Sequence, residues 1–415
     1  MKEKSLSTEF QNHFWTVISE GIAAAFLPVL ILVTTRFVGL EPAGMISYAA
    51  AVTIIFHVFI TFSAHNIQRV DVREEFCFRE YLGFRTATAA AATAAVILFL
   101  VIAGFDRLQT LIILFYYFIF LTDAFADVFM GDFHQKGMIR IMGRIRASGF
   151  FIALTAFCVM AYTTHDVMTS LLTAGMLMFI VYLMWIRFYR SHFSPIRAIL
   201  DFSTIKRFIV IMLPVLVLTF IQTYLISAPR IFLGTFDVYE MVAIYSILFT
   251  PAAMYNLLLY TPLFGSPMPR TSEAYASGQL KRFYRRIHVM LLIMAAAFIP
   301  YIAITWFFGV PLLSWLYNVD LAPFKNQLLW VSIGGIFIPA TTFIGTILII
   351  MRKQKAYMYS HIIVGAIVGP LAGVLVWLGG INGAAYSNLV IFLPLSIVVY
   401  VIFQYIIRRK LKKET

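Results

Sequence analysis

Twelve runs of predominantly apolar residues follow one another along the chain, and short charged segments separate them. Most runs have about 20 residues, the length that an α-helix needs to cross the hydrocarbon core of a bilayer. We therefore predict membrane spans at residues 14–35, 43–64, 86–105, 109–130, 147–163, 168–187, 207–229, 240–264, 287–310, 327–351, 356–379 and 383–406.

The composition supports the same interpretation. Of the 415 residues, 61% are apolar and only 12% are charged, whereas soluble domains have about 45–50% apolar and about 25% charged residues. So few charges could not solvate the surface of soluble domains. We predict an all-α integral membrane protein with about twelve transmembrane helices. The two cysteines, Cys77 and Cys158, are too few for a disulfide framework or a zinc cluster.

The basic residues predict the orientation of the spans. If the N-terminus lies in the cytoplasm, all but four of the 32 Lys and Arg residues fall in cytoplasmic segments. Such an excess is the positive-inside signal, and it predicts that both termini are cytoplasmic. The net charge of +13 then reflects topology and contact with anionic lipids rather than a nucleic-acid partner. The four exceptions on the other side are Arg36, Arg107, Arg230 and Lys325.

The connecting segments are too short to hold a soluble domain. The longest cytoplasmic ones, residues 65–85, 188–206 and 265–286, carry mixed charges and aromatic residues. We expect them to form short helices in the membrane interface. Any function must therefore take place inside or between the spans.

A weak internal repeat divides the chain into halves. The sequence Leu-Pro-Val-Leu at residues 27–30 in the first span recurs at residues 213–216 in the seventh, and each copy is followed by an arginine and a glycine. Repeats with an even number of spans are typical of two-lobed transporters. We predict an N-terminal lobe of spans one to six at residues 1–195 and a C-terminal lobe of spans seven to twelve at residues 196–415.

Three carboxylates fall inside predicted spans, where charge is costly and usually functional. Glu20 lies in the first span, and Asp123 and Asp127 share one face of the fourth because they are four residues apart. Each is a candidate for binding a coupling cation or proton. The alternative for Glu20 is a structural ion pair, and for Asp127 it is capping or pairing with a loop.

Arg36 and Arg230 end equivalent spans of the two halves, on the side that otherwise excludes positive charge. Two arginines that converge from two lobes could bind an anion such as a diphosphate. The alternative is that each side chain extends to the outer interface.

Motifs for other chemistries are missing from the sequence. There is no phosphate-binding loop of the ATPase type, no spacing typical of a metal site, and no nucleophile elbow. We therefore expect no enzyme activity, no cofactor and no bound metal.

Five local stretches together resemble the polysaccharide-transport family of bacterial flippases, the Wzx-like branch of the multidrug/oligosaccharidyl-lipid/polysaccharide exporter superfamily. They lie at residues 35–49; at 66–71 with 78–81 and Arg85; at 127–137; at 228–230 with 267–270 and 278–283; and at 309–313 through 334–335. The resemblance follows the chain in order from end to end, although each motif alone is loose.

The resemblance implies a two-lobed fold around a central cavity and a flippase function. Such a protein moves an undecaprenyl-diphosphate-linked oligosaccharide from the inner to the outer leaflet of the bacterial cytoplasmic membrane. The implied partners are the lipid-linked glycan, inner-membrane lipids and the polymerases or glycosyltransferases of the glycan. Two alternatives stay open: a cation-coupled multidrug antiporter of the same superfamily, which would use acidic residues such as Glu20, and a membrane-embedded glycan polymerase or acyltransferase.

Overall fold

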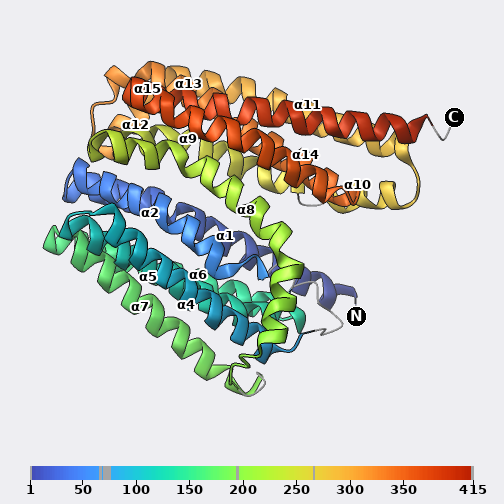
Figure 1. The fold of residues 1–415 in the computed structure, drawn as a ribbon, viewed down its shortest axis with the longest axis horizontal. Coiled ribbons are helices and arrows are strands. Elements are labelled where there is room, and N and C mark those ends of the chain that lie inside the picture. Colours follow the sequence, from blue (N-terminus) through green and yellow to red (C-terminus); the bar gives the residue numbers. More distant parts are fainter. Residues whose placement is uncertain (1, 65–67, 69–75, 193–195, 265–266, 413–415) are drawn as a thin grey trace. The chain divides into compact units, whose positions relative to one another are not determined.

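The computed structural model describes residues 2–64, 68, 76–192, 196–264 and 267–412, and helices make up nearly all of this part of the chain (Figure 1). Eleven of the helices in the described residues are long and apolar enough to cross a membrane. The predicted all-α fold is confirmed. The chain divides into two compact units, residues 1–223 and 224–415.

The first unit is a bundle of six long helices, followed by the first part of a seventh. Its helices are α1 (Lys2–Phe37), α2 (Leu40–Thr61), α4 (Phe78–Ala103), α5 (Arg107–Gln135), α6 (Ile139–Thr164) and α7 (Val167–Phe188). α6 packs against both α1 and α7, and α5 packs against both α2 and α7. The division between the two units falls within α8 (Phe202–Phe236).

The second unit holds the rest of α8 and the helices that follow it. These are α9 (Tyr239–Phe264), α10 (Pro267–Ala276), α11 (Leu280–Ile304), the π-helical turn η2 (Thr305–Gly309), α12 (Val310–Tyr317), α13 (Lys325–Gly335), α14 (Phe337–Ile350) and α15 (Gln354–Leu411). α11, η2 and α12 follow one another without a break as one apolar segment of 38 residues. α15 packs against both α13 and α14.

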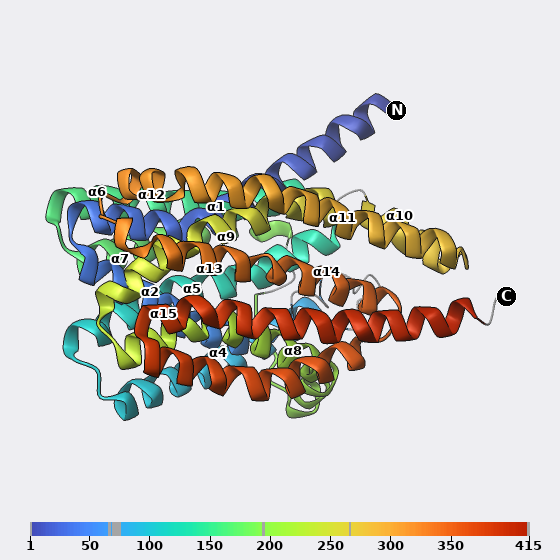
Figure 2. The same ribbon diagram turned by 90° about the horizontal axis from the view of Figure 1, so that it is seen from above.

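The last helix, α15, is two antiparallel spans joined at Gly380. Gly380 has φ 53° and ψ −130°, which no helix allows. Beyond it, Gly383 packs directly on the Leu375 carbonyl, and Ser387 Oγ donates a hydrogen bond to the Ala372 carbonyl over 3.5 Å. The chain therefore folds back on itself here (Figure 2). Counting both arms of α15, the described residues hold the twelve predicted spans.

Several helices begin earlier than the apolar runs predicted. α4 begins at Phe78 rather than residue 86, with the Cys77 N–H donating to the Glu80 carboxylate over 2.7 Å at its start. α6 begins at Ile139 rather than residue 147. The hydropathy signal marks the apolar part of a helix only, whereas the backbone hydrogen bonds continue through the charged residues before it.

A separate short α-helix is present in one of the three segments predicted to form interface helices. It is α10, within residues 265–286, whereas residues 78–85 belong to the long helix α4. Between the end of α7 and the start of α8, the described residues contain one 3₁₀ turn, Arg190–His192, and no α-helix. The extended segment after it lies on α4, since the Ile199 N–H donates to the Arg79 carbonyl over 3.1 Å.

An aromatic cluster fixes the start of α8 to the first unit. The Phe208 ring stacks on Phe76 and Phe84, with ring centroids 4.0 and 4.8 Å apart, and Phe208 is fully buried. Burial of several aromatic rings is a large apolar contribution to packing. The first part of α8 therefore packs as an integral part of the first unit.

Candidate functional site

The largest group of buried and half-buried charges in the described residues lies inside the first unit. We call it the carboxylate cluster. It consists of Glu20 on α1, Arg85 on α4, Asp123 and Asp127 on α5, Arg146 on α6 and Tyr182 on α7. Five helices thus contribute polar groups to one place in an apolar bundle.

Arg85 and Asp127 form the most buried ion pair of the cluster. The Arg85 Nη2 lies 3.2 Å from the Asp127 Oδ2, and the two side chains are 2% and 15% exposed. Asp123 also attracts the Arg85 guanidinium. Removing two charges from water is costly, so each of these side chains depends on the other for its burial.

Arg146 connects the other carboxylates. Its Nη1 lies 2.7 Å from the Glu20 Oε1, and the Glu20 side chain is half exposed. Arg146 also lies within electrostatic reach of Asp123 and Asp127. The guanidinium therefore balances charge from α1 and α5 together, and it stabilises the packing of α6 against both.

Asp123 differs from the other two carboxylates in its partners. Its Oδ1 accepts a hydrogen bond of 3.2 Å from the buried Tyr182 hydroxyl, and the residue is 5% exposed. Among the described residues, no basic group lies within 4.0 Å of this carboxylate. Gly149 on α6 leaves the space in which the Tyr182 ring lies. Asp123 is therefore held by a neutral donor.

Asp123 is the carboxylate of the cluster that is best suited to take up a positive charge. It is buried, whereas the Glu20 side chain is half exposed and paired with Arg146, and Asp127 is paired with Arg85. A negative charge among apolar helices is costly. One proton or one monovalent cation at Asp123 would neutralise it. The arrangement is suited to binding and releasing one positive charge.

The structure brings together the three carboxylates predicted from the sequence. The predicted spans begin at residues 86 and 147 and so leave Arg85 and Arg146 in connecting segments, whereas both lie within long helices. The ion pair considered for Glu20 is present, and Asp127 pairs with Arg85 of α4. Tyr182 was not predicted, because a single tyrosine in an apolar run gives no signal.

The two arginines predicted to bind an anion lie in different units. Arg36 is exposed in the last turn of α1. Arg230 on α8 is half-buried, and its Cζ lies 5.9 Å from the centroid of the Phe249 ring on α9. A half-buried arginine against an aromatic ring has lost part of its water shell. The joint anion site stays a prediction.

Two stretches that carried the family resemblance lie in contact. Gln68 donates from Nε2 to the Val128 carbonyl over 3.1 Å, and its amide packs directly on Gly131. Residues 66, 67 and 69–71 of the same motif lie outside the described residues. Near the end of α5, Lys136 Nζ lies 2.7 Å from the Asp132 carboxylate and also donates to the His192 carbonyl.

In the part of the chain that the structure describes, no group of three or more His, Cys, Asp or Glu side chains is arranged so that it could hold a metal ion. Two of the three carboxylates of the cluster pair with guanidinium groups instead, Asp127 with Arg85 and Glu20 with Arg146.

Neither a protein-family model nor a curated protein sequence matches the chain. Its fold, however, is that of known transporters. An inward-facing multidrug resistance MATE family transporter of the MOP superfamily has a TM-score of 0.71 and 13% identity, over 96% of this chain and 100% of that chain. A Vibrio cholerae MATE transporter variant has a TM-score of 0.62 and 13% identity, over 97% and 98%.

A third similar structure is a MOP superfamily transporter from Pyrococcus furiosus, with a TM-score of 0.57 and 13% identity over 98% of this chain and 96% of that chain. It is described as having a binding pocket of reverse polarity that suggests a different function. At such low identity these similarities establish the fold alone. The chain has the MATE transporter fold of two six-helix lobes.

Proposed function

We propose that the chain is a membrane transporter that works by alternating access, with the carboxylate cluster as its site for a coupling cation. The observation that carries this proposal is the buried Asp123 carboxylate, which accepts a hydrogen bond from Tyr182 and has no basic group within 4.0 Å among the described residues. The fold shared with MATE transporters supports it. The cation-coupled antiporter is therefore favoured over the flippase.

The proposed coupling works through the charge of the cluster. In the proposed mechanism a cation binds beside Asp123 and neutralises this buried carboxylate; when the cation leaves, its negative charge is left among apolar helices. A ligand shifts a conformational equilibrium only as far as it binds the two states differently. We infer that the two access states expose Asp123 differently to water, so that a change of one unit of charge shifts the equilibrium between them.

The test is transport by the purified full-length chain in proteoliposomes. A fluorescent organic cation such as ethidium should move against its gradient when a proton or sodium gradient is imposed. Asp123→Asn should lower gradient-driven transport by about tenfold or more. Asp132→Asn is the matched control, because it removes a buried carboxylate from the same helix outside the cluster.

The two results that would contradict the proposal are equally clear. If transport by wild-type protein does not depend on either gradient, the chain is not a cation-coupled transporter. If Asp123→Asn transports as well as Asp132→Asn, the carboxylate cluster is not the coupling site.

A second candidate is the flippase for a lipid-linked oligosaccharide. It is supported by the resemblance of the five stretches and by the half-buried Arg230. In a bacterial host that depends on the chain for surface glycan, Arg36→Ala and Arg230→Ala should each abolish it. Arg107→Ala, at the start of α5 and exposed, is the control. Normal surface glycan in both variants would exclude the anion site.

We propose that the protein lies in the bacterial cytoplasmic membrane with both termini in the cytoplasm. The distribution of basic residues supports this orientation. Lipid-linked glycan, glycosyltransferases and polymerases would be partners only under the flippase proposal. The glycan polymerase or acyltransferase alternative has no counterpart among the similar structures described above, which are transporters.

A further inference from the structure

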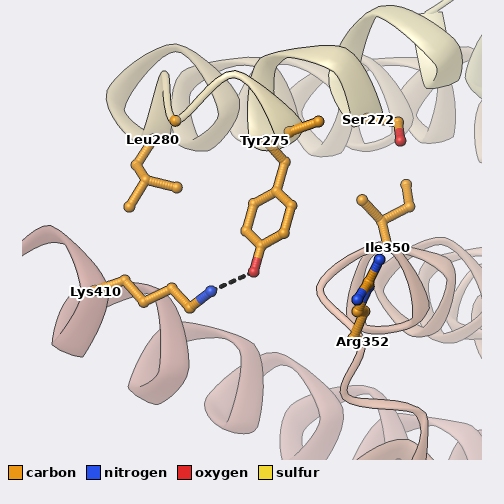
Figure 3. Close-up of a pocket in the computed structure, with 8 residues that line it drawn as sticks. Ser272, Tyr275, Leu280, Ile350, Arg352 and Lys410 are labelled. Carbon is orange, nitrogen blue, oxygen red and sulfur yellow. Dashed lines mark hydrogen bonds between the residues drawn. The ribbon is translucent and has the colours of Figure 1, made fainter.

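A basic cavity of about 700 Å³ opens at one end of the second unit. It is lined by Ser272 and Tyr275 on α10, by Ile350 and Arg352 at the end of α14, and by Lys410 near the end of α15 (Figure 3). Three elements that are far apart in the sequence thus place two cations and a phenol around one space. This end of the unit is the one predicted to face the cytoplasm.

Lys410 is held across this cavity by Tyr275. Its Nζ donates a hydrogen bond to the Tyr275 hydroxyl and lies 4.7 Å from the centroid of the ring. The side chain is half-buried, as is Tyr275. Figure 3 shows the lysine reaching from α15 toward the tyrosine of α10, with Arg352 on the other side of the space. The ammonium is therefore positioned rather than left to move in water.

A second cavity, of about 690 Å³, is also lined by Lys410. Its wall is largely apolar, with Ala356 from the first arm of α15 and a face of the second arm, Val401, Ile402, Tyr405 and Ile406. Lys353, Arg409 and Lys410 lie along it. Lys410 thus joins a basic space to an apolar groove of a size that would accept part of an acyl chain.

Arg352 occupies a backbone conformation that arginine rarely adopts. It ends α14 with φ 58°, in the left-handed region. The Lys353 N–H donates to the Leu348 carbonyl over 2.8 Å, and the Arg352 N–H to the Ile349 carbonyl over 2.9 Å. This is the Schellman helix end, where glycine is usual. An arginine here accepts backbone strain, which is a sign that its side chain has a role.

From these observations we propose that the two cavities form a binding site for one anionic phospholipid of the cytoplasmic leaflet. The phosphate lies between Arg352 and Lys410, with Ser272 as a further donor, and an acyl chain lies along the groove of Val401, Ile402 and Ile406. Basic pockets between transmembrane helices on the cytoplasmic side are suited to anionic headgroups.

The charge and polarity of the site favour a lipid over a soluble anion. Of the described residues that line the two cavities, none is acidic, and four are basic. A free phosphate would use the basic cavity alone and leave the apolar groove exposed to water. An amphipathic anion would use both, because Lys410 lines the basic cavity and the apolar groove alike.

The test is lipid retention by the purified full-length protein, measured by native mass spectrometry with phosphatidylglycerol and, in parallel, zwitterionic phosphatidylethanolamine. Wild-type protein should retain one phosphatidylglycerol at concentrations at which it retains no phosphatidylethanolamine. The double variant Arg352→Gln, Lys410→Gln should weaken this retention by about 30-fold, from the contribution of two basic residues to an anionic lipid.

The matched control is Lys355→Gln with Arg408→Gln, which removes the same charge from the two arms of α15 without touching either cavity. Unchanged retention in this control supports the site; an equal loss in both variants would overturn it. Displacement of the lipid by millimolar inorganic phosphate would overturn it as well, because the site would then be one for a soluble anion. If a polyprenyl diphosphate displaced phosphatidylglycerol preferentially, the proposal of a resident phospholipid would be overturned, and the site would be one for a transported lipid.

Discussion

The Tyr182 hydroxyl donates a 3.2 Å hydrogen bond to the Asp123 carboxylate, between α7 and α5 of the first unit. Tyr182 can lie there because Gly149 on α6 has no side chain in its way. The absence of a side chain at Gly149 on α6 therefore allows the Tyr182 hydroxyl of α7 to reach the Asp123 carboxylate of α5.

The first prediction is that Gly149→Ala disturbs this arrangement. A methyl group at residue 149 would overlap the Tyr182 ring, and overpacking of a buried site costs about 1–3 kcal/mol. The thermal unfolding midpoint in detergent should fall. Gly21→Ala is the control, because no described atom outside its own helix turn lies within 4 Å of the added methyl group. An equal effect of both substitutions would contradict the prediction.

The second prediction concerns the buried ion pair of Arg85 and Asp127, 3.2 Å apart. Arg85→Met alone should destabilise the protein by about 3–5 kcal/mol, because it leaves a buried carboxylate without its partner. The double variant Arg85→Met, Asp127→Leu should recover much of this loss, since both charges are then absent. Chemical unfolding of the four proteins of this cycle gives the coupling. A double variant as unstable as the sum of the single variants would show that the pair does not couple.

These two sites show what the sequence could and could not predict. The spans follow from a local signal: about 20 apolar residues cannot be placed elsewhere than in a membrane. The pairing of Arg85 with Asp127 joins residues 42 positions apart, and no local pattern fixes which helices become neighbours. An arginine close to the end of an apolar run looks the same whether it faces water or a buried carboxylate.

Charge placement predicts a topology, but it does not locate the site. Arg85 and Arg146 count toward the cytoplasmic side in the predicted topology, and the predicted spans leave both in connecting segments. The earlier starts of α4 and α6 place them inside the bundle. A carboxylate at the same depth in a neighbouring span would indicate that such an arginine faces the interior of the bundle.

The third prediction is a pH dependence at the start of α8. Asp201 caps this helix by accepting hydrogen bonds from the Ser203 hydroxyl and from the Thr204 N–H and hydroxyl, the latter two over 2.9 Å. These bonds, that of the Ser203 hydroxyl above all, lower the pKa of Asp201 to about 2. Because the folded pKa lies below the unfolded value of about 3.9, the capping contribution is present above about pH 4 and is lost as the pH falls toward 2.

Hydrogen exchange of the first turn of α8, corrected for intrinsic rates, measures this. Protection of residues 202–206 should fall between pH 4 and pH 2 in the wild-type protein. Asp201→Asn, which cannot titrate, should show the same protection at both pH values. A pH-dependent loss of protection in the Asn variant as well would assign the effect to another group.

The fourth prediction follows from the fold-back of α15 at Gly380. A single helix of the 58 residues of α15 would be about 87 Å long at 1.5 Å per residue, far longer than a bilayer is thick. With two spans, Asn382 and Cys77 must face opposite sides of the membrane. The experiment uses intact cells that express the protein with Cys158 replaced by Ala. An impermeant maleimide should label the Asn382→Cys variant at residue 382, but it should not label the exposed Cys77. Labelling of Cys77 without permeabilisation would contradict the predicted topology.

The last prediction separates stability from ligand binding at Arg352. Its left-handed backbone, with φ 58°, costs a residue with a Cβ about 1 kcal/mol, and glycine avoids this cost. Arg352→Gly should therefore raise the free energy of unfolding by up to about 1 kcal/mol while it weakens retention of phosphatidylglycerol. The control is Lys353→Gly, which makes the same kind of change one residue later, where φ is −114°. That variant gains nothing from glycine and should be less stable than wild type. If Arg352→Gly were destabilising by as much as Lys353→Gly, the arginine would be the residue that the turn itself requires, and its conformation would give no argument for a lipid site.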